Sequence, residues 1–185
     1  MLPVNRVAQS EIIVFNLEEL WDNRPIVTFD IAPYLIEGLV LQEKSFREAM
    51  KTLDWSAFKD KHVAISCSTD AIVPTWAYML IASRLKDIAA STTLGTKEDV
   101  LREYFTRALE QVDWSRYEGK PVVIKGCGSA VVPDSAYVQA TQKLQAVARK
   151  IMYGEPCSSV PIWRKPSTSS ARPARTKKPA IPPLK

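Results

Sequence analysis

The chain repeats one stretch of its own sequence at an offset of 59 residues, and this duplication limits its possible folds more than any other feature. Residues 46–78 align with residues 105–137 without a gap. The identical residues of the first copy are Phe46, Ala49, Asp54, Trp55, Ser56, Lys61, Val63, Ile65, Ala71, Val73, Pro74, Ala77 and Tyr78. Because 13 of 33 positions are identical, chance is a poor explanation, and one structural unit is expected to occur twice.

Both copies show the same order of local patterns. A helix ends before an Asp-Trp-Ser turn, an apolar strand follows at 62–66 or 121–125, and a second helix begins at a Val-Pro pair. Proline is favoured in the first turn of a helix because an N–H there has no partner within the helix. The pattern therefore predicts an internal βα repeat over residues 46–85 and 105–144.

The alternation of strands and helices predicts an α/β fold with a mainly parallel sheet and helices on both faces. The run from Pro121 to Ile124 has no polar face, which is typical of a central strand. Two further strands are predicted at 11–15 and 26–29, with turn-forming residues between them, and they indicate an N-terminal β-hairpin. A short strand is also expected near 92–94, before a helix that Thr96 and Asp99 cap.

The net charge of +5 belongs to the C-terminal end of the chain. Residues 164–185 carry seven basic and no acidic side chains, whereas the remainder has 18 basic and 20 acidic side chains. The same segment is rich in proline and has little to bury, which is the composition of disordered segments. We therefore predict a single α/β domain at 1–163 and a disordered basic tail at 164–185. Such a tail would bind nucleic acid only weakly and with strong salt dependence.

Hydropathy and cysteine content indicate a cytoplasmic protein without a membrane partner. No apolar run approaches the roughly 18 to 20 residues that span a bilayer, and the N-terminus lacks a secretory pattern. Three cysteines are an odd number and do not suggest an exported disulfide framework. In a reducing compartment such thiols are free, metal-bound or redox-active. The oligomeric state is left open by the sequence.

A cysteine follows the strand in both copies, Cys67 in the first and Cys127 in the second. Ligands of open α/β sheets bind beyond the carboxyl ends of the strands. A helix N-terminus lies a few residues further on, and its partial positive charge favours a thiolate. The two loops therefore predict a thiolate site.

The position of Cys157 depends on where the preceding helix ends. A helix that ran unbroken from Pro133 to Met152 would be about 30 Å long and would carry Cys157 to the opposite end of the sheet. A kink, or a loop that folds back at Gly154 and Pro156, would instead bring three sulfur atoms together. Both arrangements remain open.

If the three sulfur atoms do converge, thiolate ligands select zinc or iron. Asp70 is then the nearest candidate for a fourth ligand, with Glu155 as the substitute. His62, the only histidine, is predicted to be an exposed residue at the start of a strand. It lies at the wrong end of that strand to activate Cys67, so an ordinary Cys/His protease mechanism is not supported.

Three segments of the chain, at 67–79, 124–128 and 151–161, resemble the uncharacterised bacterial family called domain-of-unknown-function family 2480. The resemblance covers roughly residues 4–163 and leaves out the basic tail. It supplies no activity, but it implies an association with iron–sulfur-cluster assembly genes. The set of three cysteines and Asp70 is similar to the ligands of U-type cluster scaffolds, although their Cys-Gly-Asp motif is absent here.

The leading hypothesis is a thiolate site that binds zinc, iron or an iron–sulfur cluster, or accepts sulfur, in iron–sulfur assembly. Its partners would be iron–sulfur assembly proteins. One alternative is a cysteine-dependent enzyme or redox protein in which Cys67 or Cys127 is the nucleophile. Another is an interaction protein with no active site.

Overall fold

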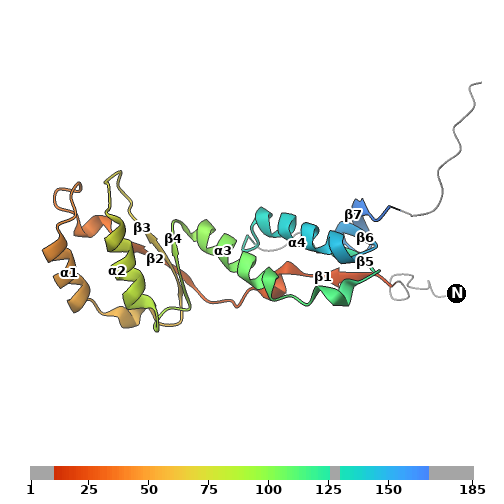
Figure 1. The fold of residues 1–185 in the computed structure, drawn as a ribbon, viewed down its shortest axis with the longest axis horizontal. Coiled ribbons are helices and arrows are strands. Elements are labelled where there is room, and N and C mark those ends of the chain that lie inside the picture. Colours follow the sequence, from red (N-terminus) through yellow and green to blue (C-terminus); the bar gives the residue numbers. More distant parts are fainter. Residues whose placement is uncertain (1–10, 126–129, 167–185) are drawn as a thin grey trace, which may run out of the picture.

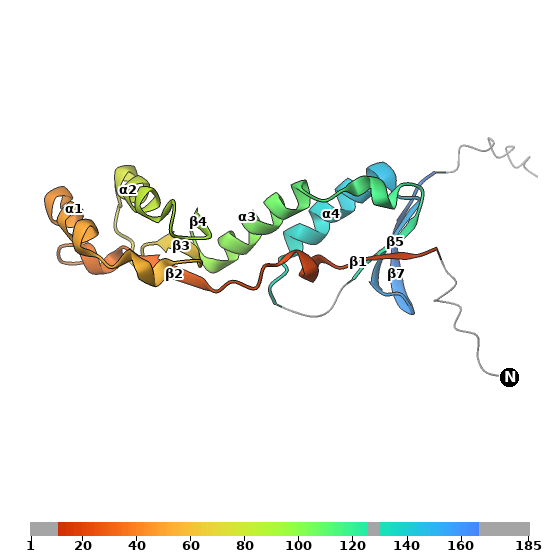
Figure 2. The same ribbon diagram turned by 90° about the horizontal axis from the view of Figure 1, so that it is seen from below.

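The computed structural model describes residues 11–125 and 130–166, which form two lobes along an elongated body (Figures 1 and 2). Each lobe has its own small sheet and its own apolar core. The predicted α/β class, the mainly parallel pairing and the internal repeat are all confirmed. Within the described ranges, no helix is both long and apolar enough to cross a membrane.

The first lobe, called the inserted lobe, comprises residues 26–94. Its elements are β2 (Ile26–Asp30), the 3-10 helix η2 (Ala32–Tyr34), α1 (Glu43–Thr52), η3 (Trp55–Phe58), β3 (His62–Ser66), α2 (Thr75–Leu85) and β4 (Ser91–Leu94). The strands lie in the order β2-β3-β4, and both pairings are parallel.

The second lobe, called the outer lobe, comprises residues 11–21 together with 96–125 and 130–166. Its elements are β1 (Ile13–Phe15), η1 (Leu17–Leu20), α3 (Lys97–Glu110), η4 (Trp114–Tyr117), β5 (Pro121–Ile124), α4 (Asp134–Val147), β6 (Lys150–Glu155) and β7 (Ser158–Arg164). The strand order is β1-β5-β6-β7, and only β7 runs antiparallel to its neighbour. The whole inserted lobe therefore interrupts the outer lobe between η1 and α3.

The duplication extends beyond the residues that match in sequence. Phe29 pairs with Ile65 in one sheet, and Phe15 pairs with Ile124 in the other. Since Ile65 and Ile124 are repeat counterparts, β2 and β1 are counterparts as well. Each lobe thus follows the order strand, 3-10 helix, α-helix, 3-10 helix, strand, α-helix, strand.

The two N-terminal strands are present, but they do not pair with each other as the expected hairpin. Each pairs in parallel with the central strand of its own lobe, because its apolar side chain completes the core there. Phe15 lies 5.4 Å from Trp114 between ring centroids, and Phe29 lies 5.7 Å from Trp55. The segment from Asp22 to Pro25 is a connection between lobes and not a hairpin turn.

Helix α3 links the two lobes. Its first half covers one face of the inserted sheet, where the Thr93 hydroxyl donates to Glu103 at 2.8 Å. Helices α1 and α2 cover the opposite face, so this sheet has helices on both sides as predicted. The second half of α3 supplies Phe105 and Leu109 to the core of the outer lobe.

Regular structure continues slightly past the predicted start of the tail. Arg164 is the last residue of β7, and the Lys165 N–H donates to the Arg149 carbonyl at 3.0 Å. Residues 167–185, which make up most of the predicted tail, lie outside the described residues. Disorder of the tail and the single-domain assignment for 1–163 stay predictions.

Candidate functional site

The structure places the predicted site residues at the carboxyl edges of two different sheets. Cys67 directly follows β3 in the inserted lobe, and Cys157 lies in the turn between β6 and β7 in the outer lobe. Cys127 lies outside the described residues. Among residues 11–125 and 130–166, no three or more Cys, His, Asp or Glu side chains are arranged to hold a metal ion. The ligand set that also includes Asp70 therefore stays a prediction.

Cys157 reaches the carboxyl edge of the outer sheet because the preceding helix is short. Helix α4 ends at Val147, and the chain turns back into β6, which runs parallel to β5. The buried side chains of Ile151 and Met152 hold this segment in the sheet. Neither arrangement expected from the sequence is adopted, because the helix stops at Val147 and strand β6, which was not expected, carries Cys157 to this edge.

The edge around Cys157 combines an exposed thiol with an apolar cavity. Gly154 precedes the turn with a φ of 118°, which a residue with a side chain would rarely adopt. A cavity of about 340 Å³ opens at the same strand ends, where the rings of Tyr137 and Tyr153 meet edge to face at 5.6 Å. Its lining residues are Ile124, Tyr137, Val138, Thr141, Gln142, Tyr153 and Ile162.

The loop that carries Cys67 is fixed by Asp30 at the end of β2. The Asp30 carboxylate accepts hydrogen bonds from the Ser68 hydroxyl at 2.6 Å and from the Ser68 N–H at 3.0 Å. The hydroxyl bond is the main reason that the pKa of Asp30 lies below its ordinary value. Cys67 itself is half-buried, with its sulfur 3.3 Å from the Thr69 hydroxyl, while Asp70 is exposed.

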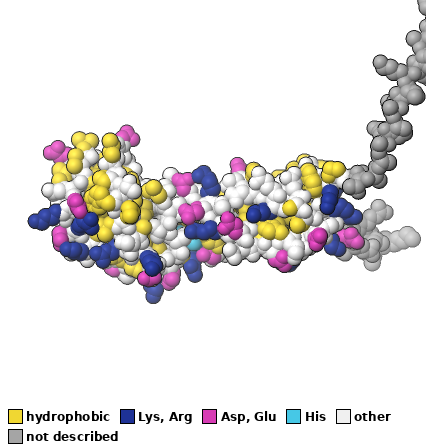
Figure 3. All heavy atoms as spheres, in the orientation of Figure 1, with side chains coloured by type: hydrophobic (Ala, Val, Ile, Leu, Met, Phe, Trp, Pro, Cys, Tyr) yellow, Lys and Arg dark blue, Asp and Glu magenta, His cyan; other side chains and the backbone are white. Residues whose placement is uncertain are grey.

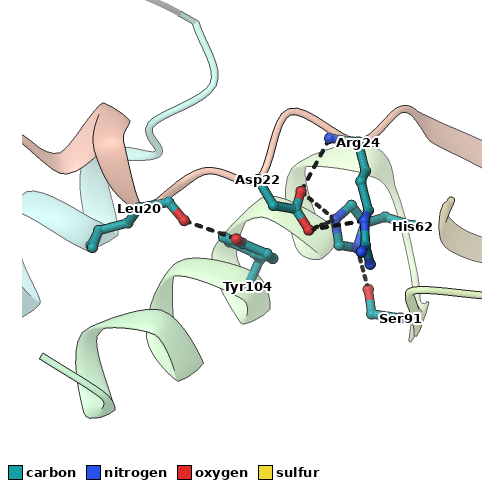
Figure 4. A network of polar contacts seen from close by, with 6 residues as sticks. All are labelled: Leu20, Asp22, Arg24, His62, Ser91 and Tyr104. Carbon is teal, nitrogen blue, oxygen red and sulfur yellow. Dashed lines mark hydrogen bonds and ion pairs between the residues drawn. The ribbon is translucent and has the colours of Figure 1, made fainter. Parts of the chain in front are cut away.

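His62 is buried, with 2% of its surface exposed, so its predicted exposure is wrong. Its Nδ1 lies 2.7 Å from the Ser91 hydroxyl, and its Nε2 lies 3.0 Å from Asp22 Oδ1 (Figure 4). Parallel pairing sets His62 beside Ser91, while the connection between the lobes brings Asp22 over the ring. Helix α3 and Trp21 cover the remaining sides.

A second cavity, of about 350 Å³, opens beside this network at the junction of the lobes. Its lining residues are Asp22, His62, Ala90, Ser91, Tyr104, Arg107, Ala108 and Gln111. The Tyr104 hydroxyl is held away from His62 because it donates to the Leu20 carbonyl at 2.8 Å. Sequence patterns could not reveal this cluster, since His62 is 29 residues from Ser91 and 40 residues from Asp22.

The comparison with family models gives one match. A family described as a protein of unknown function (DUF2480) matches residues 3–165. The chain belongs to this family. Membership of DUF2480 confirms the resemblance of the three segments, and its description assigns no activity. No curated protein and no solved structure matches the chain.

The surface charge of this DUF2480 member agrees with the composition of its body. Figure 3 shows basic and acidic side chains interspersed over the visible face of both lobes. A single-sign patch of the kind that binds polyanions is not seen on that face of the described residues.

Proposed function

We propose that the carboxyl edge of the outer sheet is a thiol site that binds a metal or iron–sulfur cluster, or accepts sulfur, in iron–sulfur cluster assembly. The observation that supports this most directly is the exposed Cys157 in the turn after β6. Strand β6 pairs in parallel with β5, and Cys127 follows β5 in the sequence. The proposed site thus contains two thiols, each of which follows one of two neighbouring strands in the sequence.

The reach of the chain permits the two sulfur atoms to act together. Ile124 pairs with Tyr153, and the two cysteines lie three and four residues beyond these positions. Segments of three or four residues span at most about 10 to 14 Å. Glu155, next to this turn, can supply an oxygen ligand. Cys67 and Asp70 follow a strand of the other lobe, so their participation is a separate question.

The two versions of this function place different demands on the thiols. Zinc and iron bind thiolates, so metal binding releases protons and protects the sulfur atoms. In sulfur transfer, a thiolate attacks the outer sulfur of a donor persulfide. A new S–S bond forms, the S–S bond of the donor breaks, and the donor leaves as a thiolate. That step requires no external oxidant.

Metal analysis of the full chain, purified anaerobically, tests the first version, and intact mass after incubation with a small-molecule persulfide tests the second. We expect Cys127→Ser and Cys157→Ser each to abolish bound metal, and the double variant to abolish added sulfur, because one thiolate is enough to attack the persulfide. Cys67→Ser, with its thiol on the other lobe, is the matched control and should retain both. Wild-type protein that takes up neither metal nor sulfur would contradict the proposal.

A second candidate is a cysteine-dependent enzyme that acts on a small apolar substrate. It is favoured by the apolar cavity of about 340 Å³ at the same edge, which has the size of a small-molecule pocket. Covalent capture by an aromatic electrophile that enters the cavity would favour this candidate. Tyr153→Ala should then slow the capture without changing the reaction with a small charged alkylating agent.

A further inference from the structure

We infer that Ser91, His62 and Asp22 form a nucleophile relay that cleaves small carboxylic esters in the cavity at the junction of the lobes. This activity would be independent of the cysteines and lies at the opposite ends of the strands from them. The relay uses the amino ends of β3 and β4 and the connection between β1 and β2. Figure 4 shows the three side chains converging from these elements.

The distances fit a serine activated by a histidine. The Ser91 hydroxyl oxygen is 2.7 Å from Nδ1 of His62, and Nε2 of the same ring is 3.0 Å from Asp22 Oδ1. Both lie in the 2.6 to 3.2 Å range in which a nucleophile, its base and an orienting group exchange or hold a proton. In the usual serine hydrolase the aspartate faces Nδ1, so the two ring nitrogens are exchanged here.

The position of the proton on His62 follows from the charge of Asp22. Burial raises the pKa of Asp22, but the hydrogen bonds from His62 and from the Arg24 N–H outweigh burial and leave it below its ordinary value. An ionised carboxylate can only accept, so Nε2 carries the proton and donates it. In the neutral imidazole, Nδ1 then has a free electron pair directed at the Ser91 hydroxyl, as a general base requires.

The outer lobe shows that the fold itself does not need this pair. The counterparts of His62 and Ser91 at the same register are Pro121 and Lys150, which begin β5 and β6. A proline and a lysine cannot form the contact between a histidine and a hydroxyl group, yet β5 and β6 pair in the same way as β3 and β4. The polar relay is therefore specific to the lobe whose strand ends face the cavity.

The cavity gives a substrate access to the serine while the base stays covered. Its volume of about 350 Å³ suits a small molecule, and Ser91 is partly exposed whereas His62 is not. Arg107 and Gln111 line the same cavity. The amide of Gln111, and the N–H groups of Arg107 other than the one that pairs with Glu103 at 3.1 Å, are the donors for an oxyanion that develops there.

The proposed reaction proceeds in two balanced steps. In the first, the Ser91 oxygen forms a bond to the ester carbonyl carbon while Nδ1 takes its proton. The bond to the alcohol oxygen breaks, and the alcohol leaves with that proton. In the second, water attacks the acyl-serine, gives a proton to Nδ1 and releases the carboxylic acid as the proton returns to Ser91.

A fluorophosphonate probe applied to the full chain tests the relay, because attack by an activated serine displaces fluoride and leaves a stable adduct. We expect one adduct, at Ser91, by intact mass and peptide mapping. Ser91→Ala and His62→Gln should abolish it, and Asp22→Asn should slow labelling by about 10³-fold or more. Ser83→Ala removes an exposed serine of α2 that hydrogen-bonds only within its own helix, so it should label as wild type.

The wild-type result can overturn the proposal even if the variants do not fold. Absence of an adduct at Ser91 in folded wild-type protein would overturn it, as would labelling that persists in a folded His62→Gln variant. A variant with all three cysteines replaced by serine should label as wild type does. This cysteine-free variant distinguishes the proposed ester cleavage from the function of the thiol site, because either one can be absent while the other is present.

Discussion

The two lobes share strand order and register, but they differ at the ends of their strands. In the core, Phe46 and Phe105 occupy equivalent buried positions, each no more than 1% exposed. At the amino ends, His62 and Ser91 stand where the outer lobe has Pro121 and Lys150. The packing residues are thus the same in the two copies, whereas the residues at the strand ends have diverged.

The carboxyl ends differ in the element that comes after the last shared strand. Gly95 follows β4 and leads into α3, whereas Gly154 lies within β6, just before the turn that carries Cys157. Both glycines have a positive φ, of 127° and 118°. The same backbone bend therefore precedes a helix in one lobe and an antiparallel strand in the other.

The largest expected effect concerns the shared helix and tests how far the lobes are independent. Phe105→Ala and Phe46→Ala each remove a fully buried ring, so each should lower the free energy of unfolding by about 3 to 5 kcal/mol. Because α3 contributes to both lobes, Phe105→Ala should unfold them in one transition. Urea titration followed by tryptophan fluorescence and by circular dichroism measures this. Two separate transitions would show that the single-domain prediction is wrong.

A smaller loss in the free energy of unfolding is expected when the equivalent tryptophans of the two repeat copies, Trp55 and Trp114, are replaced. The indole N–H of Trp55 donates to the Met50 carbonyl at 3.1 Å, and that of Trp114 donates to the Leu109 carbonyl at 3.2 Å. Both rings are half-buried, so each is less enclosed than a core side chain. Replacing either by phenylalanine should cost about 1 kcal/mol, mainly through the lost hydrogen bond. Chemical denaturation of the two variants should give equal losses in the free energy of unfolding. A marked difference would show that the two Asp-Trp-Ser turns are not structurally equivalent.

The residue at the end of the first strand should make a pH-dependent contribution to stability in the inserted lobe but not in the outer lobe. Asp30 has a lowered pKa in the folded protein, so its stabilising effect is present above about pH 4 and is lost as the pH falls through the folded value. Its counterpart, Asn16, does not titrate. Asp30→Asn should therefore remove about 0.5 kcal/mol or less at pH 6, and the loss should become smaller as the pH falls to 2. Unfolding at the two pH values checks this, and an equal loss at both would exclude the ionised form as the cause.

No effect is expected from removing residues 167–185, which follow β7 and Lys165 in the sequence. The melting temperature should stay that of the full chain, because the segment has little apolar surface to bury. Truncation before Arg164 is the matched comparison and should lower it, because it removes the end of β7 and the bond from Lys165 to Arg149. Calorimetry of both truncations measures the difference. A lower melting temperature for the first would show that the tail docks on the body.

Local patterns predicted the elements well because they depend on neighbours in the sequence. The strand expected at 62–66 is β3 (His62–Ser66), and the cap expected before α3 forms, with the Thr96 N–H donating to Asp99 at 2.8 Å. The hairpin was wrong because turn-forming residues such as Asn23 and Pro25 are equally compatible with a connection between lobes. The local sequence pattern does not show which sheet a strand will join.

The candidate sites were predicted only in part, for the same reason. The position of Cys67 after β3 followed from the strand pattern and is confirmed. The position of Cys157 depended on where α4 ends, which is decided by burial of Ile151 against the outer core. The burial of His62 requires Asp22 and α3, both distant in sequence, and no periodicity encodes that approach.

The nesting of one lobe within the other sets the order in which the chain can fold as it is synthesised. Ile13 of β1 pairs with Val122 of β5, so β1 leaves the ribosome about 100 residues before its partner. At roughly 5 to 20 residues per second this delay lasts about 5 to 20 seconds. The strands of the inserted lobe, by contrast, all lie within residues 26–94 and can assemble during that interval. The later lobe is then completed by closing a long loop whose middle is already folded, which shortens the flexible length of chain between β1 and β5.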